Sequence, residues 1–543
     1  MFVTLYQTEI SDPVLKSIAK LNSRNKTRKM IFRSLRWIWA FLTTCSLLAD
    51  SDKKAQNIIV CVSENHAAGL LGSLDKFGSS LDPTPNLSKI AQTGFSHPKA
   101  YCTNSSPGHS AFSLLTGLPK DTDLRDFDPT TSLAKHFQSQ GYKTAYFGSW
   151  SWDNKPDHFG FDQWYTLADA EIFFNPKIKD AKTNQVFEGH STDIITDLAI
   201  RWVRKAHDTG KPFFIILSFN SMNRPWIPPV RMVNKYNEEW FTVPENFFTD
   251  FEERTPANKY QCMNIAQDLD PMSDLFLESM TDINQTLNQV SVLTKNLDSM
   301  NDEQKSAWML SWKAQNEAFS RESLTEESSA IWKFQRYLKN YLRCLLAMDE
   351  NIGRLFQFTK SQNKENNQFI YTSERGRFTG EFGWFGSEWM YEPSTRIPFI
   401  YTDDNTNSIL QISSDAIWLD RDLYKLLKNN SVLGTESLSP KDEFYFSHHK
   451  FEQNNRVSPH QGLRKGRYKI IQYYPYDEWE FYDLLSDPME NRNLYHSHSH
   501  KDTIEHYKKL LQEACESQEL SSPKFEFSEI WKRDQRSPNK KTR

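Results

Sequence analysis

Several residues of this 543-residue chain combine reactive or charged side chains at spacings that could support chemistry. Ser105 and His109 stand four residues apart, so a hydroxyl could serve as a nucleophile with an imidazole as its base. The alternative for this pair is two polar residues on the surface of a loop. Further groups of polar residues each follow an apolar run directly, at 63–66, 220–225 and 373–376.

The elements that must position these groups are read from the apolar runs. Continuous runs rich in β-branched and aromatic residues are typical of strands buried on both faces of a parallel sheet, and they occur at 57–62, 212–219 and 368–372. Helical patterns lie between them, as at 132–140 and 191–205, and another follows at 331–356. This alternation predicts an α/β fold, with a large mixed or parallel sheet sandwiched by helices. Sites in such folds form at the carboxyl ends of the strands, so we expect the polar groups to meet there.

The composition narrows the class of protein. Charged residues make up 25% of the chain and the net charge is -4, which gives no electrostatic reason to expect nucleic acid as a partner. Six cysteines in so long a chain do not make a disulfide scaffold. The 14% share of aromatic residues supplies a packed core, so we expect a folded protein.

The N-terminal segment is predicted to direct export. Basic residues on both sides of Met30 precede an uncharged, mostly apolar run at 37–48. This pattern is typical of a secretory signal, and the run is shorter than the roughly 20 residues that a membrane helix needs. We therefore expect residues 1–49 to be a signal peptide or export segment of a periplasmic, cell-surface or secreted protein. Contact with a membrane is expected only through that signal or a lipid anchor at the N-terminus.

The rest of the chain divides by composition. Residues 50–440 are predicted to form the large α/β domain, with a polar helical insertion at about 266–330. Residues 441–520 are predicted to form a smaller C-terminal α+β subdomain, because Tyr- and Trp-rich strand patterns there read as an antiparallel hairpin. Residues 521–543 form a charged tail.

Short motifs occur along most of the chain in an order that is specific as a set. They include Asn57-Ile58-Ile59, Leu114-Leu115-Thr116-Gly117, Arg224-Pro225-Trp226, Tyr391-Glu392-Pro393-Ser394-Thr395-Arg396 and Tyr482-Asp483-Leu484. From Asn57 to about Leu494, the chain resembles a sulfatase of the alkaline-phosphatase superfamily. The segment at 332–344 that leads into Asp349 is most similar to bacterial carbohydrate sulfatases of the N-acetylglucosamine-6-sulfatase type. The resemblance implies the alkaline-phosphatase-like sulfatase fold.

The resemblance also implies definite chemical groups. A divalent cation, usually calcium, is held by carboxylate and amide oxygens. The nucleophile is a formylglycine made from Cys or Ser in a C/S-x-P-x-R motif. Lysine and histidine side chains neutralise the sulfate and protonate the leaving oxygen.

The positions that the resemblance assigns to metal ligands hold Glu64, Asn65 and Glu374, followed by Arg375. The first three offer oxygen, so calcium is the cation expected if any is bound. Glu64 is one methylene longer than the aspartate of the family, and Asn65 lacks a charge. Arg375 has no acceptor atom, and its charge repels a metal. It could replace the charge of the metal, or it could be an ion-paired residue at the mouth of the site.

The nucleophile region allows two registers. Counting back from Leu115-Thr116-Gly117 without a gap places Pro107 at the nucleophile and Ala111 at the arginine that directs maturation. A shift of two residues places Ser105 at the nucleophile and His109 at that arginine. Neither register supplies the arginine, so we expect no formylglycine at Ser105.

The remaining chemical positions differ from the family as well. Ser149 and Ser151 replace the lysine and histidine of its Gly-Lys-Trp-His motif. Asn223 replaces a histidine before Arg-Pro-Trp, and Ser387 replaces a lysine after Gly-Trp-Phe. These changes remove the sulfate-neutralising cations and the usual proton donor. Because the glycines, prolines and core strands match the family, this contrast predicts a scaffold with a non-catalytic role.

The sequence thus supports three hypotheses. The first is an exported sulfatase-family protein, related to sulfated-polysaccharide processing, that is catalytically impaired and binds sulfated polysaccharide or carbohydrate sulfate. Arginine suits oxyanions, so its substrate contacts would include Arg224, Arg375 and Arg377, with Asn223, Ser149, Ser151 and Ser387. The second is an active sulfate-ester hydrolase that uses Ser105 and a calcium-like cation on Glu64, Asn65 and Glu374. The third is a structural or partner-binding surface protein that uses the 266–330 insertion.

Overall fold

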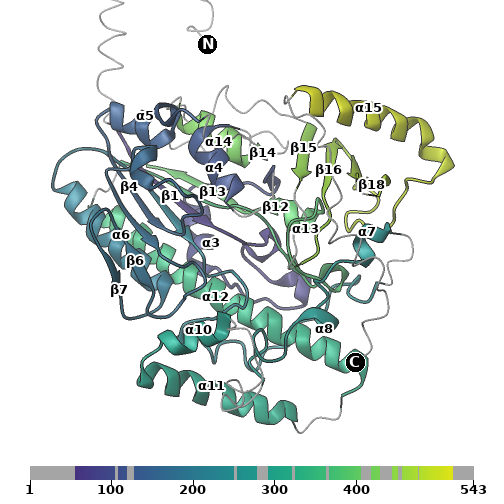
Figure 1. Cartoon of the computed structure of the whole chain (residues 1–543), viewed down its shortest axis with the longest axis horizontal. Coiled ribbons are helices and arrows are strands. Elements are labelled where there is room, and N and C mark those ends of the chain that lie inside the picture. The colour runs from purple at the N-terminus through teal and green to yellow at the C-terminus, as the bar shows by residue number, and fades with distance from the viewer. Residues whose placement is uncertain are drawn as a thin grey trace, which may run out of the picture. The chain divides into compact units, whose positions relative to one another are not determined.

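A nine-stranded sheet forms the centre of the computed structural model, with strand order β2-β13-β9-β1-β8-β4-β5-β6-β7 (Figure 1). The structure describes residues 55–103, 108–118, 127–249, 254–277, 292–320, 324–362, 366–404, 417–428, 443–449, 455–474 and 476–517. The predicted export segment at 1–49 and the predicted tail at 521–543 lie outside these residues. No helix in the described part of the chain is both long enough and apolar enough to cross a membrane.

The middle of the sheet is parallel and its margins are antiparallel. Its parallel strands are β9 (Asn367–Ser373), β1 (Asn57–Ser63), β8 (Phe213–Phe219), β4 (Lys143–Gly148) and β5 (Gln163–Leu167). Its antiparallel strands are β2 (Phe95–Ser96), β13 (Phe399–Asp403), β6 (Lys177–Lys179) and β7 (Asn184–Val186). The three apolar runs of the sequence therefore became the three adjacent central strands, which confirms the predicted α/β fold with a mixed sheet.

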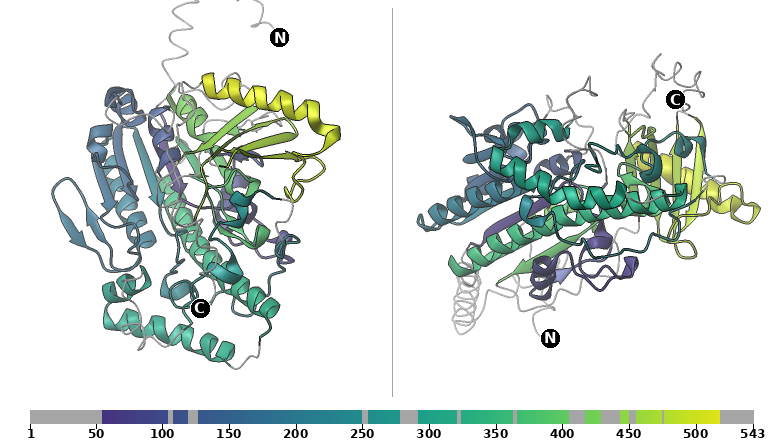
Figure 2. Two further views of the ribbon diagram at one scale, coloured as in Figure 1. Left: turned by 45° about the vertical axis from the view of Figure 1, so that its right-hand side comes forward. Right: turned by 90° about the horizontal axis from the view of Figure 1, so that it is seen from below.

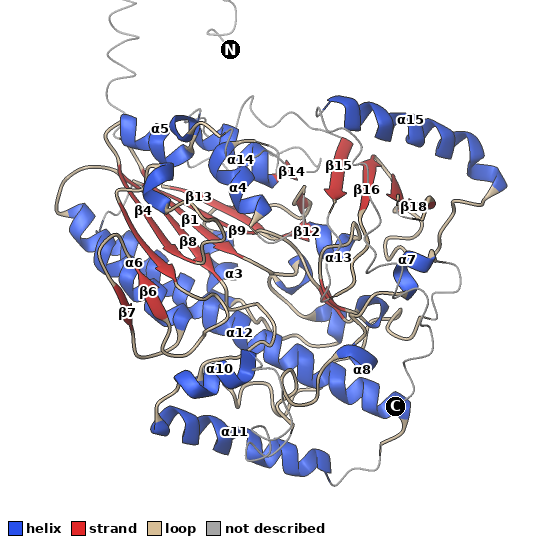
Figure 3. Cartoon of the chain, in the orientation of Figure 1, coloured by secondary structure: helices blue, strands red, loops and turns tan. Residues whose placement is uncertain are grey.

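Helices cover both faces of this sheet (Figure 3). Successive residues of a strand point to opposite faces, so β1 contributes to two cores. Ile59 and Cys61 belong to a core with α3 (Pro85–Gln92), α6 (Ser191–His207) and α12 (Glu326–Gln362), the last of which runs along the sheet in Figure 2. Ile58 and Val60 belong to a core with α4 (His109–Thr116), α5 (Leu133–Ser139) and α14 (Leu419–Lys428). Burial on both faces explains why the strand sequence is apolar without alternation.

The predicted C-terminal hairpin is part of a four-stranded antiparallel sheet. Its strands are β15 (Glu443–His448), β16 (His460–Lys465), β17 (Tyr468–Tyr473) and β18 (Glu478–Asp483). One face packs against α15 (Lys501–Ser517), and the other contacts the aromatic segment around Trp384 and Tyr391.

Shorter elements complete the fold. The polar stretch near 266–330 contains α8 (Ile265–Asp268), α10 (Val292–Ser299) and α11 (Asp302–Ser320), and Trp308 and Trp312 of α11 are buried. Small sheets pair β3 (Ala100–Tyr101) with β12 (Arg396–Ile397) and β14 (Ile417–Trp418), and β10 (Phe378–Thr379) with β11 (Phe385–Gly386). The remaining short helices are α7 (Pro256–Lys259) and α13 (Glu392–Thr395).

Candidate functional site

The carboxyl ends of the central strands bring the predicted polar residues to one edge of the sheet. Backbone hydrogen bonds continue the strand ladder into the residues that follow. The N–H of Glu64 donates to Phe219 O at 3.1 Å, and the N–H of Glu374 donates to Ser63 O at 2.8 Å. The N–H of Ser149 donates to Ser218 O at 3.0 Å. The parallel register thus fixes where these side chains begin.

Two asparagines join the strand ends through a chain of hydrogen bonds. The amide of Asn223, from the loop after β8, donates to the Glu64 carboxylate, and its oxygen accepts from the Asn65 amide. The oxygen of Asn65 in turn accepts from Arg375 Nε at 2.6 Å. Glu64, Asn65 and Arg375 are buried. The sequence regions after β1, β8 and β9 therefore share one buried network.

Arg375 is held in this network by its backbone as well as by its side chain. The next residue, Gly376, donates its N–H to Ser394 O at 2.8 Å. A Cβ at position 376 would lie 2.3 Å from Pro393 O and 2.5 Å from Arg396 O, so only glycine fits. The guanidinium of Arg375 also pairs with Glu388, at 3.5 Å between Nη1 and Oε1.

Glu374 connects the end of β9 to the start of α4. Its Oε2 accepts the N–H of Gly108 at 3.0 Å, and its side chain is buried. Burial, and to a lesser degree the nearby charge of Glu64, raises the pKa of Glu374 to about 8 against the opposing effects of Arg375 and the Gly108 N–H. Glu374 is therefore largely protonated at neutral pH.

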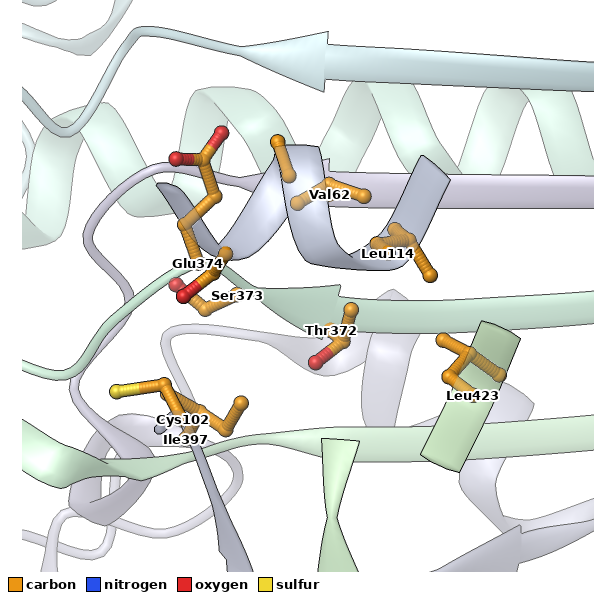
Figure 4. A pocket seen from close by; sticks show the side chains of 10 residues that line it. Val62, Cys102, Leu114, Thr372, Ser373, Glu374, Ile397 and Leu423 are labelled. Carbon is orange, nitrogen blue, oxygen red and sulfur yellow. The ribbon is translucent and has the colours of Figure 1, made fainter. Parts of the chain in front are cut away.

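A small cavity lies between the β9 end and α4, and the Glu374 side chain lines it (Figure 4). Its volume is about 20 Å³, which is room for about one water molecule. Val62, Leu114 and Leu423 make much of its wall apolar. This cavity is too small for a saccharide, so it is packing space beneath the site.

The serines at the substituted positions lie around this edge. Ser149 and Ser387 are buried, and Ser151 is exposed. A Cβ built on Gly108 would lie 2.8 Å from the Cβ of Ser151, so Ser151 adjoins the start of α4. Ser387 directly precedes Glu388, the partner of Arg375. Each of these serines offers a hydroxyl where the resemblance implies a cation or a proton donor.

Two further arginines differ in their surroundings. Arg224 makes a bidentate ion pair with Asp274, at 2.7 Å from Nε and 2.5 Å from Nη2, and lies 4.9 Å from the ring centre of Phe385. Its charge is thus already paired with a carboxylate from the polar insertion. The guanidinium of Arg377 lies 5.4 Å from the ring centre of Trp226.

Arg377 is a buried cation beside this network that takes no part in its hydrogen bonds. Its side chain is 6% exposed, and its Nε lacks a hydrogen-bond partner within the described residues. Burial lowers the pKa of Arg377, and the Tyr337 and Tyr341 hydroxyls oppose that shift. Arginine stays charged in either case.

The oxygen atoms of this site do not fit a divalent cation. Glu64, Asn65 and Glu374 each present an oxygen that already accepts an N–H, and one of these N–H groups belongs to the charged guanidinium of Arg375. Within the described ranges, no three side chains of His, Cys, Asp or Glu gather as a metal-binding group. Ser105 and Pro107 lie outside those ranges, and of His109 only the backbone, at the start of α4, is described.

Sequence reasoning missed the partners of the two paired arginines, Glu388 and Asp274. Asp274 is 50 residues from Arg224 along the chain, in the polar insertion. Glu388 stands beside Ser387, the expected lysine position, and its backbone φ of 84° is unusual for a residue other than glycine. The sequence held one signal that could have identified Glu388: it is an acidic residue directly after Ser387, where the resemblance implies a lysine.

Comparisons with known proteins agree with this architecture. The sulfatase family model matches residues 56–414, and the model "N-sulphoglucosamine sulphohydrolase, C-terminal" matches residues 380–517. An N-acetylglucosamine-6-O-sulfatase of Bacteroides thetaiotaomicron is 28% identical over 524 residues, which cover 91% of this chain and 92% of the relative. An arylsulfatase of Clostridium perfringens is 22% identical over 507 residues, covering 81% of this chain and 91% of the relative.

The structural match is of the same kind. A solved structure, described as a complex with its substrate D-glucosamine-2-N,6-O-disulfate, superposes with a TM-score of 0.77 at 27% identity, over 87% of this chain and 99% of that chain. The predicted resemblance to bacterial carbohydrate sulfatases is confirmed. With the family model matched over most of its length, the chain belongs to the sulfatase family.

Proposed function

We propose that this protein binds sulfated saccharides at the carboxyl ends of its central strands, around Glu64, Asn65, Asn223 and Arg375, and does not hydrolyse the sulfate ester. The observation that carries the proposal is the closed network of Glu64, Asn223, Asn65 and Arg375. In this network one oxygen of Glu64 and the oxygen of Asn65, which the resemblance assigns to a metal, accept internal hydrogen bonds instead.

Hydrolysis of a sulfate ester needs groups that stabilise developing charge and protonate the leaving oxygen. Fixed cations and hydrogen-bond donors at such positions each contribute about 3–4 kcal/mol to transition-state stabilisation. At Ser149, Ser151 and Ser387 this chain carries neutral hydroxyls, which neither supply a full positive charge nor donate a proton readily at neutral pH. Losing several such groups is expected to abolish turnover.

Binding of a sulfate group has different requirements, and the arginines near this site support the proposal. A sulfate group needs donors fixed near its oxygens, and a guanidinium presents several in one plane. Arg377 is buried and charged, its Nε lacks a hydrogen-bond partner within the described residues, and it stands two residues from Arg375. The similar relative is named for N-acetylglucosamine-6-O-sulfate, and the similar structure holds a disulfated glucosamine. We therefore propose a sulfated glucosamine unit as the ligand class, with Arg377 as the first contact for its sulfate.

Export is part of the same proposal. The basic and apolar pattern before residue 49 would deliver the protein to the compartment where sulfated polysaccharides are met. Cell fractionation of the full chain, beside a variant that lacks residues 1–49, tests it. A full chain that stays in the cytosol contradicts export.

The test of function measures binding and turnover on the same purified chain with D-glucosamine-2-N,6-O-disulfate. Calorimetry is expected to show binding, and ion chromatography is expected to show no sulfate release. Arg377→Gln should weaken binding at least tenfold, whereas Arg201→Gln, on the exposed face of α6, should not change it. Sulfate release that Ser105→Ala abolishes would instead establish the hydrolase with a cation on Glu64, Asn65 and Glu374.

A further inference from the structure

Arg375 stands where the resemblance implies a ligand of the divalent cation, and its surroundings show what it does there. Calcium takes six to eight oxygen ligands at about 2.3–2.6 Å, so each ligand must direct a free lone pair at the ion. Asn65 instead directs its oxygen at Arg375 Nε, 2.6 Å away. The positive charge nearest to this oxygen is therefore the guanidinium.

The other candidate ligands face donors as well. One Glu64 oxygen accepts from the Asn223 amide, and one Glu374 oxygen accepts from the Gly108 N–H at 3.0 Å. Donor hydrogens thus point at all three residues from three different segments of the chain. A metal at this position would have to compete with the guanidinium for the Asn65 oxygen, rely on the second oxygens of Glu64 and Glu374, and lie beside a fixed cation, which repels it.

Arg375 is not free to move aside. Its side chain is 7% exposed, and Glu388 lies 3.5 Å from its Nη1. Gly376 is packed directly against the carbonyl groups of Pro393 and Arg396, so there is no room for a side chain on the residue after Arg375. The guanidinium bridges the end of β1, the end of β9 and the 380–388 loop, which is the bridging work that a metal ion performs in a pocket of oxygen ligands.

We infer that the Arg375 guanidinium is the built-in cation of the strand-end site. Neither the stability of the fold nor the structure of this site then requires a divalent metal ion. The inference deepens the proposed function and rests on it for the role of the strand-end site in ligand binding. Arg375 acts as a positioning residue that orients Asn65 and Glu388, while Arg377 remains for the ligand.

The first experiment uses the purified wild-type chain and calcium alone as the probe. Elemental analysis is expected to find far less than one calcium, magnesium, manganese or zinc ion per chain. The thermal unfolding midpoint is expected to be the same after EDTA dialysis and in millimolar calcium. One tightly held ion per chain, or a midpoint that falls in EDTA and recovers in calcium, would overturn the inference whether or not any variant folds.

The second experiment removes the cation and supplies an oxygen instead, with Arg375→Asn. This variant should unfold at a lower temperature than the wild type, and calcium should raise its midpoint in a concentration-dependent way. Arg377→Asn also removes a buried guanidinium, but it leaves Asn65 paired, so its midpoint should not respond to calcium. A folded Arg375→Asn that ignores calcium, or an Arg377→Asn that responds equally, would show that Arg375 is not what excludes the metal.

Failure of this inference is distinguishable from failure of the proposed function. Bound calcium without sulfate release overturns the built-in cation alone. Sulfate release from a metal-free chain overturns the non-hydrolytic function alone. Bound calcium together with sulfate release that Ser105→Ala abolishes overturns both.

Discussion

Two largely buried polar networks of this molecule are built differently. One is the strand-end site of Glu64, Asn65, Asn223 and Arg375. The other is the seam between the large domain and the C-terminal sheet, around Lys469. At the seam, Lys469 Nζ lies 2.9 Å from Glu392 Oε1 and 2.7 Å from Glu490 Oε1, and it donates to Met390 O at 3.0 Å. Arg464 adds a second cation, 3.1 Å from Glu392. Opposite charges there are in direct contact.

In the strand-end site, neutral amide side chains lie between the charged residues. Asn223 and Asn65 stand between Glu64 and Arg375, and the Arg375–Glu388 pair is longer than the pairs at the seam. The seam is therefore a set of matched ion pairs that holds two parts of the fold together. The strand-end site consists of groups that satisfy one another indirectly, through neutral amides.

The largest loss of stability is expected from a substitution that breaks the ion pairs of the seam. Lys469→Met should lower the free energy of unfolding by about 3–5 kcal/mol, because it leaves the Glu392 and Glu490 carboxylates buried beside fewer cations. Urea denaturation of the purified chain measures the change. Lys465→Met, which removes the half-exposed pair with Glu443, is the control and should cost at most about 1 kcal/mol. Similar losses for both variants would contradict the matched-pair view of the seam.

The next effect is the pH dependence of the unfolding free energy that Glu374 confers. The pKa of Glu374 is about 8 in the folded chain and about 4.5 when unfolded, so the folded state holds its proton more tightly. The stability from this group is present below the unfolded pKa and is lost as pH rises through about 8, by at most about 5 kcal/mol. Glu374→Gln should flatten this decline in a series of unfolding midpoints between weakly acidic and weakly alkaline pH. An equal decline in the variant would assign the pH dependence to other groups.

A smaller effect is expected from Arg375→Met. It removes a donor from Asn65 and a cation from Glu388, and it should cost about 1–3 kcal/mol of unfolding free energy. The loss should be below that of Lys469→Met, because the first partner of Arg375 is a neutral amide. Urea denaturation of the two variants side by side checks the order. A larger loss for Arg375→Met would make the strand-end site, rather than the seam, the main buried ion-pair site.

The smallest effect is expected at Ser151, and it tests whether this residue belongs to the strand-end site. Ser151 is exposed beside the start of α4, so Ser151→Ala should change the unfolding free energy by no more than about 0.5 kcal/mol. Its effect on binding of the disulfated glucosamine should likewise be within the error of calorimetry. A strong loss of affinity with unchanged stability would place Ser151 among the ligand contacts.

The sequence was sufficient to predict the fold because continuous apolar runs such as 57–62 have few alternatives to a doubly buried strand. It was also sufficient to predict which residues gather at the sheet edge, since parallel register places strand ends together. The pairing of those residues could not be predicted. Asn65 and Arg375 are 310 residues apart along the chain, and nothing local indicates which oxygen meets which cation.

The prediction of anion contacts illustrates the same limit. Arg224 and Arg377 look equivalent as arginines near strand ends, but the structure pairs Arg224 with Asp274 and leaves the Nε of Arg377 without a hydrogen-bond partner within the described residues. The difference depends on where a single acid of the polar insertion folds back. Composition describes that insertion only as polar and helix-rich.

The close approach at Gly376 has a consequence for redesign. Because the backbone there is clamped between carbonyl groups, the positions on either side can change their side chains while the chain path is kept. Side chains of the strand-end site can thus be exchanged while the backbone that carries them is kept. A library varied at 64, 65, 149, 223, 375 and 387 can be selected for sulfate release on one constant scaffold, as a further test of the proposed non-hydrolytic site.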